Sequence, residues 1–253
     1  MIEKRDILRP WSMDKLAVAL FVAFLFSAEA RDLLNQSGLR WAYLLLLSFG
    51  VGFVVTPLIY SLAPRLGAID VPAGRKAHDA PTALLGGVAL YIAFAVTVLR
   101  NFAFTDELKG IVLAGTLILA VGLADDLFDI PAGWRLLAQL VAVAILIHYG
   151  VAISFLPDTV WGMVGEWLLT AFWVIGITNA IAFLDGMDGL AAGTAGINAL
   201  FFGLVAWQNS QFDMMFLALP LLGACLSFLV YNFRPGQGAW IFLGDAGSTF
   251  LGF

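Results

Sequence analysis

Long apolar runs recur along the whole chain, and they limit its fold more than any other feature. Charged residues make up 12% of the sequence, against about 25% in soluble globular domains, which excludes an ordinary soluble protein. The runs lack the alternation of apolar and polar residues that marks barrel strands, so they favour helices. We predict an all-α, polytopic integral membrane protein with about nine transmembrane helices, at residues 16–30, 41–62, 84–99, 110–124, 136–150, 163–184, 190–207, 214–231 and 240–253.

The first and the last of these segments differ from the others. Residues 1–40 are predicted to form a leader, in which basic residues precede an apolar run and then AEA at 28–30. A cleaved signal peptide has this order too, but the long stretch before the apolar run favours a retained membrane helix. Residues 41–253 are predicted to form one multi-span domain. Its last segment, 240–253, would be about 21 Å long as a helix, shorter than the roughly 30 Å hydrocarbon core, so we expect this domain to be incomplete at its C-terminus.

The distribution of charge predicts an orientation. If the N-terminus lies inside and the spans alternate, nine of the 13 Lys and Arg residues fall in inner loops, in the direction of the positive-inside rule. The same alternation places eight carboxylates at the inner face: Asp70, Asp79, Asp125, Asp126, Asp129, Asp185, Asp188 and Asp245. The sequence therefore predicts an acidic site at the cytoplasmic face of the plasma membrane.

The stretch DDLFD contains three of these acids, Asp125, Asp126 and Asp129. On a helix Asp125 and Asp129 would share a face, with Asp126 about 100° away. The plainest alternative is a charged helix end. With no Lys or Arg between residues 110 and 134, however, the three acids lack a local counter-charge, which favours a bound cation such as Mg²⁺.

Two further acidic motifs follow. In DGMDG, Asp185 and Asp188 would share a face if the segment is helical, and the alternative is that one of them caps the helix beginning near Leu190. In GDAGS, Asp245 stands at the start of an apolar segment, where it could hold a metal against a phosphate or cap the helix.

A basic loop supplies charge of the opposite sign. Arg75, Lys76 and His78 lie between Pro72 and Pro81, and cations at the membrane face can bind the phosphate of a lipid or a nucleotide. The alternative is an ordinary positively charged inner loop. Cations beside many acids at a lipid–water boundary suggest Mg²⁺-assisted phosphoryl chemistry between a polar phosphate ester and a lipid.

Four stretches in this order resemble the polyprenyl-phosphate N-acetylhexosamine-1-phosphate transferases over roughly residues 41–253. They are GAIDVPAGRKAHDAPTALLGG, VGLADDLFDIPAGWRLLAQ, TNAIAFLDGMDGLAAG and FLGDAGSTFLGF. The form RKAHDAP…GG looks more like the branch that uses UDP-N-acetylglucosamine (UDP-GlcNAc) than the branch that uses UDP-N-acetylmuramoyl-pentapeptide. The resemblance implies transfer of a sugar-1-phosphate from a UDP-sugar to undecaprenyl phosphate, with release of UMP and a requirement for Mg²⁺ or Mn²⁺.

The resemblance also implies roles for single residues. Asp125 and Asp126 would act on the lipid phosphate and lie near the metal, with Asp126 as a second ligand, and Asp245 would be the main Mg²⁺ ligand. The donor would be held by six residues, of which the last occupies a position usually taken by a basic residue: Asn179, Asp185, Asp188, Lys76, His78 and Arg135. The implied partners are a UDP-sugar, a polyprenyl phosphate and membrane lipid, with no nucleic acid, and a homodimer is one expected assembly.

Two local departures separate this chain from the family pattern. Ala182 stands where the family usually has a second Asn before DGxDG, so nucleotide recognition or sugar choice could differ. Before FLGDAGS the family has a short basic link after N-x-x-P, whereas this chain has the longer NFRPGQGAWIF, with Trp240 near the usual cation.

Other functions remain to be compared with this one. A phosphatidyl-type alcohol transferase needs Ala-Arg shortly after its DG motif, which DGLAAG lacks, and a soluble prenyl diphosphate synthase has no spans. A cation transporter would place carboxylates within its spans, whereas the outer acids here, such as Asp106, Asp158 and Asp213, fall in predicted loops. A degenerate, non-catalytic relative that acts as a membrane partner stays an alternative because of Ala182 and the short C-terminal segment.

Overall fold

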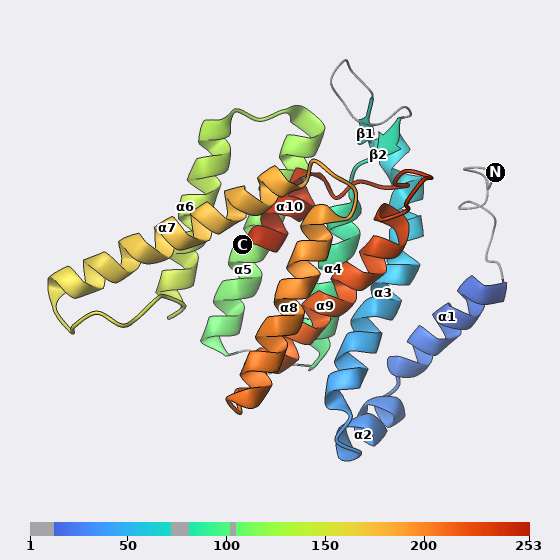
Figure 1. The fold of residues 1–253 in the computed structure, drawn as a ribbon, viewed down its shortest axis with the longest axis horizontal. Helices are drawn as coiled ribbons and strands as arrows, with labels where there is room; N and C mark the ends of the chain where they lie inside the picture. The colour runs from blue at the N-terminus through green and yellow to red at the C-terminus, as the bar shows by residue number, and fades with distance from the viewer. Residues whose placement is uncertain (1–12, 72–80, 102–104) are drawn as a thin grey trace.

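The computed structural model describes residues 13–71, 81–101 and 105–253. In these ranges the chain forms ten α-helices and a small two-stranded sheet (Figure 1). The helices are α1 (Met13–Leu25), α2 (Ala28–Gln36), α3 (Arg40–Leu62), α4 (Gly86–Asn101), α5 (Asp106–Phe128), α6 (Ala132–His148), α7 (Val160–Leu184), α8 (Leu190–Gln208), α9 (Phe212–Asn232) and α10 (Gly244–Gly252).

The all-α, polytopic prediction is confirmed. Five segments are long and apolar enough to cross a membrane: Arg40–Leu66, Asp106–Phe128, Val160–Leu184, Leu190–Gln208 and Phe212–Asn232. The apolar helices α4 and α6 have 16 and 17 residues. Eight of the nine predicted segments overlap one described helix each, and segment 16–30 covers most of α1 and the first turn of α2. Helices α1 and α10 have 13 and nine residues, below the roughly 20 that span the hydrocarbon core. Helix α2 was not predicted, because its sequence AEARDLLNQ is largely polar.

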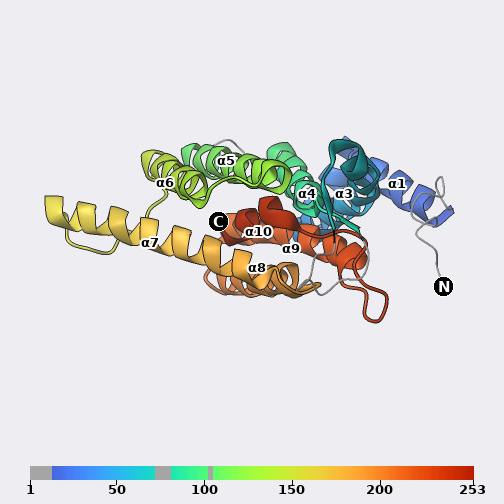
Figure 2. The same ribbon diagram turned by 90° about the horizontal axis from the view of Figure 1, so that it is seen from above.

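The helices form two groups that meet at α10. Helices α3, α4, α8 and α9 pack on one another, and α1 and α2 pack on α3. Helix α5 packs on α6 and α10, while α7 runs across the other side of α10, so that the short α10 lies between α5 and α7 (Figure 2). Tyr43, Leu44, Leu47 and Phe228 are completely or almost completely buried at the centre of the first group.

The outer surface is apolar, as a lipid environment requires. On α7, for example, Phe172 and Phe183 are 76% and 88% exposed. Inside the fold, a small residue lets α5 approach α10. A Cβ atom on Gly122 would lie 2.6 Å from the Cα atom of Ala246, so the two backbones can touch only where α5 has glycine.

The small sheet is joined to the start of α10. Strand β1 (Ile69–Asp70) pairs antiparallel with β2 (Thr82–Ala83), and Ala83 forms a parallel bridge with Ile241. The Phe242 N–H donates to the Ala83 carbonyl oxygen at 2.8 Å, and the Gly87 N–H donates to the Leu243 carbonyl oxygen at 2.8 Å. The sheet therefore fixes the link between α9 and α10 against the start of α4.

Candidate active site

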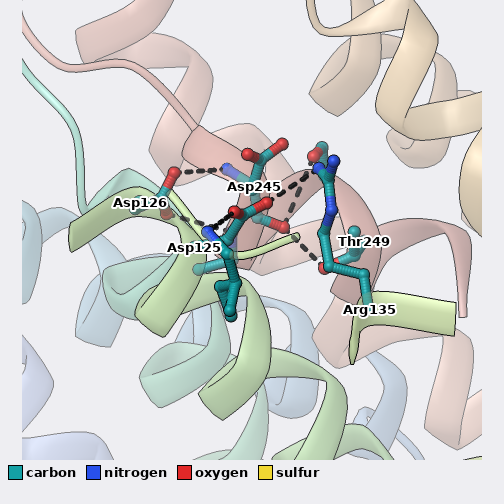
Figure 3. A network of polar contacts seen from close by, with 8 residues as sticks. Asp125, Asp126, Arg135, Asp245 and Thr249 are labelled. Carbon is teal, nitrogen blue, oxygen red and sulfur yellow. Dashed lines mark hydrogen bonds and ion pairs between the residues drawn. The ribbon is translucent and has the colours of Figure 1, made fainter. Parts of the chain in front are cut away.

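Asp125 lies in the last turn of α5 and is buried. One of its carboxylate oxygens accepts the Ile130 N–H at 2.8 Å, and the other lies 2.8 Å from an Arg135 guanidinium nitrogen on α6 (Figure 3). The sequence prediction that these acids lack a local counter-charge is therefore wrong. Arg135 follows directly after the interval 110–134, and the turn between α5 and α6 folds it back onto Asp125.

This turn also corrects the predicted arrangement of Asp129. Helix α5 ends at Phe128, and Asp129 adopts a left-handed conformation with φ of 51° and donates its N–H to the Asp125 carbonyl oxygen. Pro131 then precedes α6. Asp129 is exposed and does not continue the helical face of Asp125, because the left-handed cap turns the chain away from the helix axis.

Asp126 holds the N-terminus of α10. Its two carboxylate oxygens accept the N–H groups of Asp245 and Ala246 at 2.7 and 3.0 Å (Figure 3). The capping role considered for Asp245 thus belongs to Asp126, which lies 119 residues earlier in the chain. Gly244 makes this contact possible, since its φ is +75° and a Cβ atom there would lie 2.6 Å from an Asp126 oxygen.

Asp245 brings a third carboxylate to the same place. It lies in the first turn of α10, and its side chain interacts with that of Asp125. The structure therefore brings Asp125, Asp126 and Asp245 together, with Arg135 beside them. Among the residues that the structure describes, three carboxylates beside one guanidinium leave an excess of negative charge, which a cation or a phosphate-bound cation would relieve.

The link between α7 and α8 carries Asp185 and Asp188, and it is not helical. Helix α7 ends at Leu184, and the N-terminal cap of α8 is Gly189, with φ of 79° and no side-chain cap. The two acids therefore neither share a helical face nor cap α8. Burial, with the nearby charges of Asp245, Asp126 and Asp188, raises the pKa of Asp185 to about 7.

Asp188 is exposed, and it faces the link between α9 and α10. Its carboxylate accepts the Ala239 N–H at 3.0 Å. This contact joins the α7–α8 link to the α9–α10 link.

Asn232, at the end of α9, was not singled out from the sequence as a site residue. Its side-chain oxygen accepts the Gly189 N–H at 2.6 Å, and its amide nitrogen donates to the Ile241 carbonyl oxygen at 2.9 Å. The buried Asn232 thus connects the α7–α8 link to the strand-like segment before α10. The only sequence signal for it was its place at the head of NFRP.

Asn179 lies five residues before the end of α7, and its amide group is turned to a neighbouring helix. Its nitrogen donates to Oε1 of Gln139 on α6 at 3.0 Å and to the Ile175 carbonyl oxygen at 2.7 Å. Gln139 is 6% exposed. In this structure Asn179 therefore links α7 to α6, and its predicted contact with the nucleotide stays a prediction.

Two predicted phosphate-binding residues, Lys76 and His78, lie outside the described residues. The strands that flank their loop are described, and they join the start of α10 through Ala83 and Ile241. On the link before α10, the Arg234 guanidinium lies over the Trp240 ring, 3.8 Å from its centre. Trp240, which stands near the position of the family's usual cation, therefore has the Arg234 cation against its ring.

The carboxylates of this site are potential ligands of a metal ion. Among the residues that the structure describes, no group of three or more His, Cys, Asp or Glu side chains is arranged to hold one. Mg²⁺ usually binds through one or two carboxylates and completes its shell with water and substrate phosphates. Asp245 fits this mode best, since Asp126 is engaged by backbone N–H groups and Asp125 by Arg135.

Comparison with known proteins gives the site a context. The model of glycosyl transferase family 4 matches residues 108–253. A probable undecaprenyl-phosphate N-acetylglucosaminyl 1-phosphate transferase of Bacillus subtilis is 31% identical over 227 residues, covering 87% of this chain and 63% of that protein. A decaprenyl-phosphate N-acetylglucosaminephosphotransferase of Mycolicibacterium smegmatis is 35% identical over 226 residues, covering 80% of this chain and 55% of that protein.

A second kind of relative is also similar. A phospho-N-acetylmuramoyl-pentapeptide-transferase of Lactiplantibacillus plantarum is 31% identical over 241 residues, covering 86% of this chain and 74% of that protein. The chain thus spans between about half and two thirds of the length of the first relatives it matches. The family model matches more than half of the chain, and the matched region includes most of α5, the α7–α8 link and α10, which carry the acids of the site. The chain therefore belongs to glycosyl transferase family 4.

Proposed function

We propose that this chain transfers an N-acetylhexosamine-1-phosphate group, most favourably GlcNAc-1-phosphate, from a UDP-sugar to undecaprenyl or another polyprenyl phosphate and releases UMP. The observation that carries this proposal is the meeting of Asp125, Asp126 and Asp245 beside Arg135 at one end of the bundle. The names of the relatives support a polyprenyl phosphate acceptor and an N-acetylhexosamine.

In the proposed reaction, an oxygen of the polyprenyl phosphate attacks the phosphorus that carries the sugar. A new P–O bond forms there, and the bond from that phosphorus to the oxygen shared with UMP breaks. Asp125 is suited to accept a proton from the lipid phosphate or to orient it, because its carboxylate lies between Arg135 and Asp245. Arg135 is 43% exposed, so its remaining N–H groups can bind a phosphate oxygen.

A divalent cation belongs to this proposal. Asp245, with Asp126 as the second carboxylate, would hold Mg²⁺ or Mn²⁺, which when bound neutralises the charge of the diphosphate. Asp126 also keeps the α10 N-terminus in place through its two hydrogen bonds. The N–H groups of this helix end and Arg135 add positive potential toward a phosphate.

The donor is proposed to lie against the α7–α8 link. Asp185 and Asp188, and Asn179 nearby on α7, would contact the nucleotide, while Lys76 and His78 would bind phosphate. We propose that this end of the bundle faces the cytoplasm, since the alternation of the predicted spans assigns nine of the 13 Lys and Arg residues to that side. Among the buried polar residues of the described chain, Asp125 is the only one with a charged side chain, and it lies in the last turn of α5. The ion path of a transporter would place carboxylates within the spans, so this position favours an enzyme site.

The reaction can be tested with membranes that contain this chain, UDP-[¹⁴C]GlcNAc, undecaprenyl phosphate and Mg²⁺. We expect butanol-extractable label that is lost with EDTA and reversed by added UMP. Asp245→Asn should abolish the label, whereas Asp213→Asn, a change of an exposed acid at the far end of α9, should not. Absence of label from both UDP-GlcNAc and UDP-N-acetylmuramoyl-pentapeptide would instead support the non-catalytic alternative.

A further inference from the structure

A pair of side-chain amides joins α6 to α7. Gln139 on α6 is 6% exposed, and it is the one polar residue of that helix between Arg135 and His148. Its side-chain oxygen accepts a hydrogen bond from the amide nitrogen of Asn179 on α7 at 3.0 Å. The proposed reaction assigns a nucleotide contact to Asn179 but gives no role to the buried Gln139.

On α6 this pair lies close to the ion pair of the acidic site. Gln139 follows Arg135 by four residues, which is about one helical turn and a rise of about 6 Å. Residues at this spacing lie on the same face of a helix. Arg135 reaches Asp125 on α5, whereas Gln139 reaches Asn179 on α7. One face of α6 therefore carries both contacts, and Asn179 is bound one turn from the residue that pairs with Asp125.

On α7 the pair lies along the stretch that passes α10 (Figure 2). A Cβ atom on Gly252, at the end of α10, would lie 2.6 Å from the Cα atom of Thr178. Farther along the chain, the charge of Asp245 in the first turn of α10 acts on the Asp185 carboxylate. Asn179 directly follows Thr178, so it lies on the segment of α7 that leads to the acids.

Hydrogen bonds fix the orientation of the Asn179 amide. Its nitrogen has two N–H groups, which donate to Oε1 of Gln139 at 3.0 Å and to the Ile175 carbonyl oxygen at 2.7 Å. A backbone carbonyl oxygen can only accept, so the amide nitrogen and not the amide oxygen must face Ile175. Gln139 must then present its oxygen to the second N–H group. The Asn179 nitrogen therefore has no N–H group left for a ligand.

The side-chain oxygen of Asn179 remains available. It has no hydrogen-bond partner among the residues that the structure describes. It is also not one of the buried polar atoms that lack a partner, so it is accessible to a bound molecule. One turn nearer the α7–α8 link, Ala182 offers no second amide. An amide oxygen accepts hydrogen bonds and cannot donate one to a phosphate oxygen.

We propose that Gln139 is a positioning residue, which holds Asn179 so that its oxygen accepts a hydrogen bond from an N–H or O–H group of the UDP-sugar. This inference rests on the proposed function. Because Gln139 occupies the second N–H group, the amide of Asn179 is kept from rotating. The ionised diphosphate of the donor offers only acceptor oxygens, so the group that Asn179 recognises belongs to the uridine or to the sugar.

A double-mutant cycle on the purified chain in detergent tests this inference. Gln139→Met keeps a side chain of similar length but replaces the amide by a weakly accepting sulfur, and Asn179→Ala removes the second amide. Calorimetric titration with UDP-GlcNAc and Mg²⁺ gives the Kd of each variant. We expect Gln139→Met to raise the Kd about fivefold and Asn179→Ala about tenfold, as for the loss of one hydrogen bond. The double variant should match Asn179→Ala alone, because Gln139 acts through Asn179.

Thr170→Val is the matched control for a loss of packing in the same helix. Thr170 is buried on α7, nine residues before Asn179, and its hydroxyl oxygen accepts the Ile153 N–H at 3.0 Å. This variant should lower the unfolding temperature and leave the Kd unchanged. Titration with UDP then locates the recognised group. An equal loss for UDP and UDP-GlcNAc in Gln139→Met places the group on the uridine, and a loss for UDP-GlcNAc alone places it on the sugar.

Several results would overturn the inference. They are additive effects in the double variant, an unchanged Kd in Gln139→Met, an equal rise of the Kd in Thr170→Val, and absence of binding of both UDP and UDP-GlcNAc to the unchanged chain. The transfer reaction is measured separately, by the label formed in membranes. Label without coupling between the two amides would refute only the positioning role of Gln139, whereas coupled binding without label would refute only the transfer reaction.

Discussion

The two turns that carry the acids of the candidate active site are built differently. The α5–α6 turn is held by its own residues, since the Asp125 carboxylate bonds to Ile130 and Arg135 within ten positions of the chain. The α7–α8 link is held from outside, through Asn232 on α9 and through Ala239. A turn fixed by its own buried contacts keeps its geometry, whereas a link fixed by a distant helix depends on how that helix and its neighbours pack.

This difference suggests that the two regions have different roles in the proposed reaction. The groups proposed to act on the phosphates lie on the locally fixed α5–α6 turn and on α10, which that region caps through Asp126. The groups proposed to contact the nucleotide lie on the link that is held from a distance. We therefore expect changes at the first region to reduce kcat and changes at the second to raise KM for the UDP-sugar.

Asp125→Asn should have the largest effect on activity. The amide keeps an oxygen that can accept the Ile130 N–H but loses the charge that faces Arg135. We expect kcat to fall about a hundredfold or more, the range that general acid–base groups contribute. The matched control is Asp129→Asn, because Asp129 is exposed and has a φ of 51° that asparagine also tolerates. If Asp125→Asn kept more than half of the activity in the membrane assay, the assignment of the chemistry to this turn would be wrong.

Gly244→Ala should have the next largest effect, and mainly on stability. The new Cβ atom would meet the Asp126 carboxylate at 2.6 Å, and the φ of +75° is unfavourable for alanine. Such a residue costs about 1–3 kcal/mol, and the displaced Asp126 should lower kcat as well. The measurement is the unfolding temperature of the purified chain in detergent. It is reported by a thiol-reactive fluorophore, which reacts with the one cysteine, the buried Cys225, when the chain unfolds.

Gly236→Ala separates the two causes of this loss. Gly236, on the link that precedes α10, has a φ of +76°, but a Cβ atom there would meet nothing within 4 Å. It should therefore show the cost of the backbone conformation alone and leave transfer unchanged. Equal losses of stability and activity in both variants would mean that the contact with Asp126 has no special importance.

Asn232→Ala tests the external support of the α7–α8 link. It leaves the Gly189 N–H and the Ile241 carbonyl oxygen without their partner, and each unsatisfied buried group costs about 1–3 kcal/mol. We expect KM for the UDP-sugar to rise about tenfold while kcat changes less. Asn209→Ala is the control, because Asn209 is exposed and bonds to Val205 in the last turn of its own helix. A fall in kcat with unchanged KM would contradict the proposed positioning role.

The sequence predicted the helices well and their ends less well. Helix α7 was predicted at 163–184 and is observed at Val160–Leu184, because a long apolar run marks a span without reference to the rest of the chain. The end of α5 was missed, since nothing in DDLFD indicates that Asp129 takes a left-handed conformation. Helix α2 was missed because it is largely polar, and a search for apolar runs does not detect such a helix.

For the acids, the sequence predicted a shared location, whereas their roles stay predictions. Asp125, Asp126 and Asp245 were expected at one face, and alternation of the spans was enough to bring them there. Their partners were not predictable from spacing, because the contact of Asp126 with Asp245 joins residues 119 positions apart. The same is true of Asn232, whose two bonds depend on the close packing of α9 beside the α7–α8 link.

Asp188→Asn should have the smallest effect and gives the sharpest comparison of the two turns. Asp188 is exposed, and an amide oxygen can still accept the Ala239 N–H that its carboxylate accepts now. We expect KM for the UDP-sugar to rise about fivefold, the equivalent of about 1 kcal/mol for one altered hydrogen bond, with kcat unchanged. Asp188→Ala, which removes the acceptor, should raise KM further and loosen the link. If Asp188→Asn instead lowered kcat as much as Asp125→Asn does, the α7–α8 link would take part in the phosphoryl chemistry, and the distinction between a locally fixed catalytic turn and a distantly held binding link would fail.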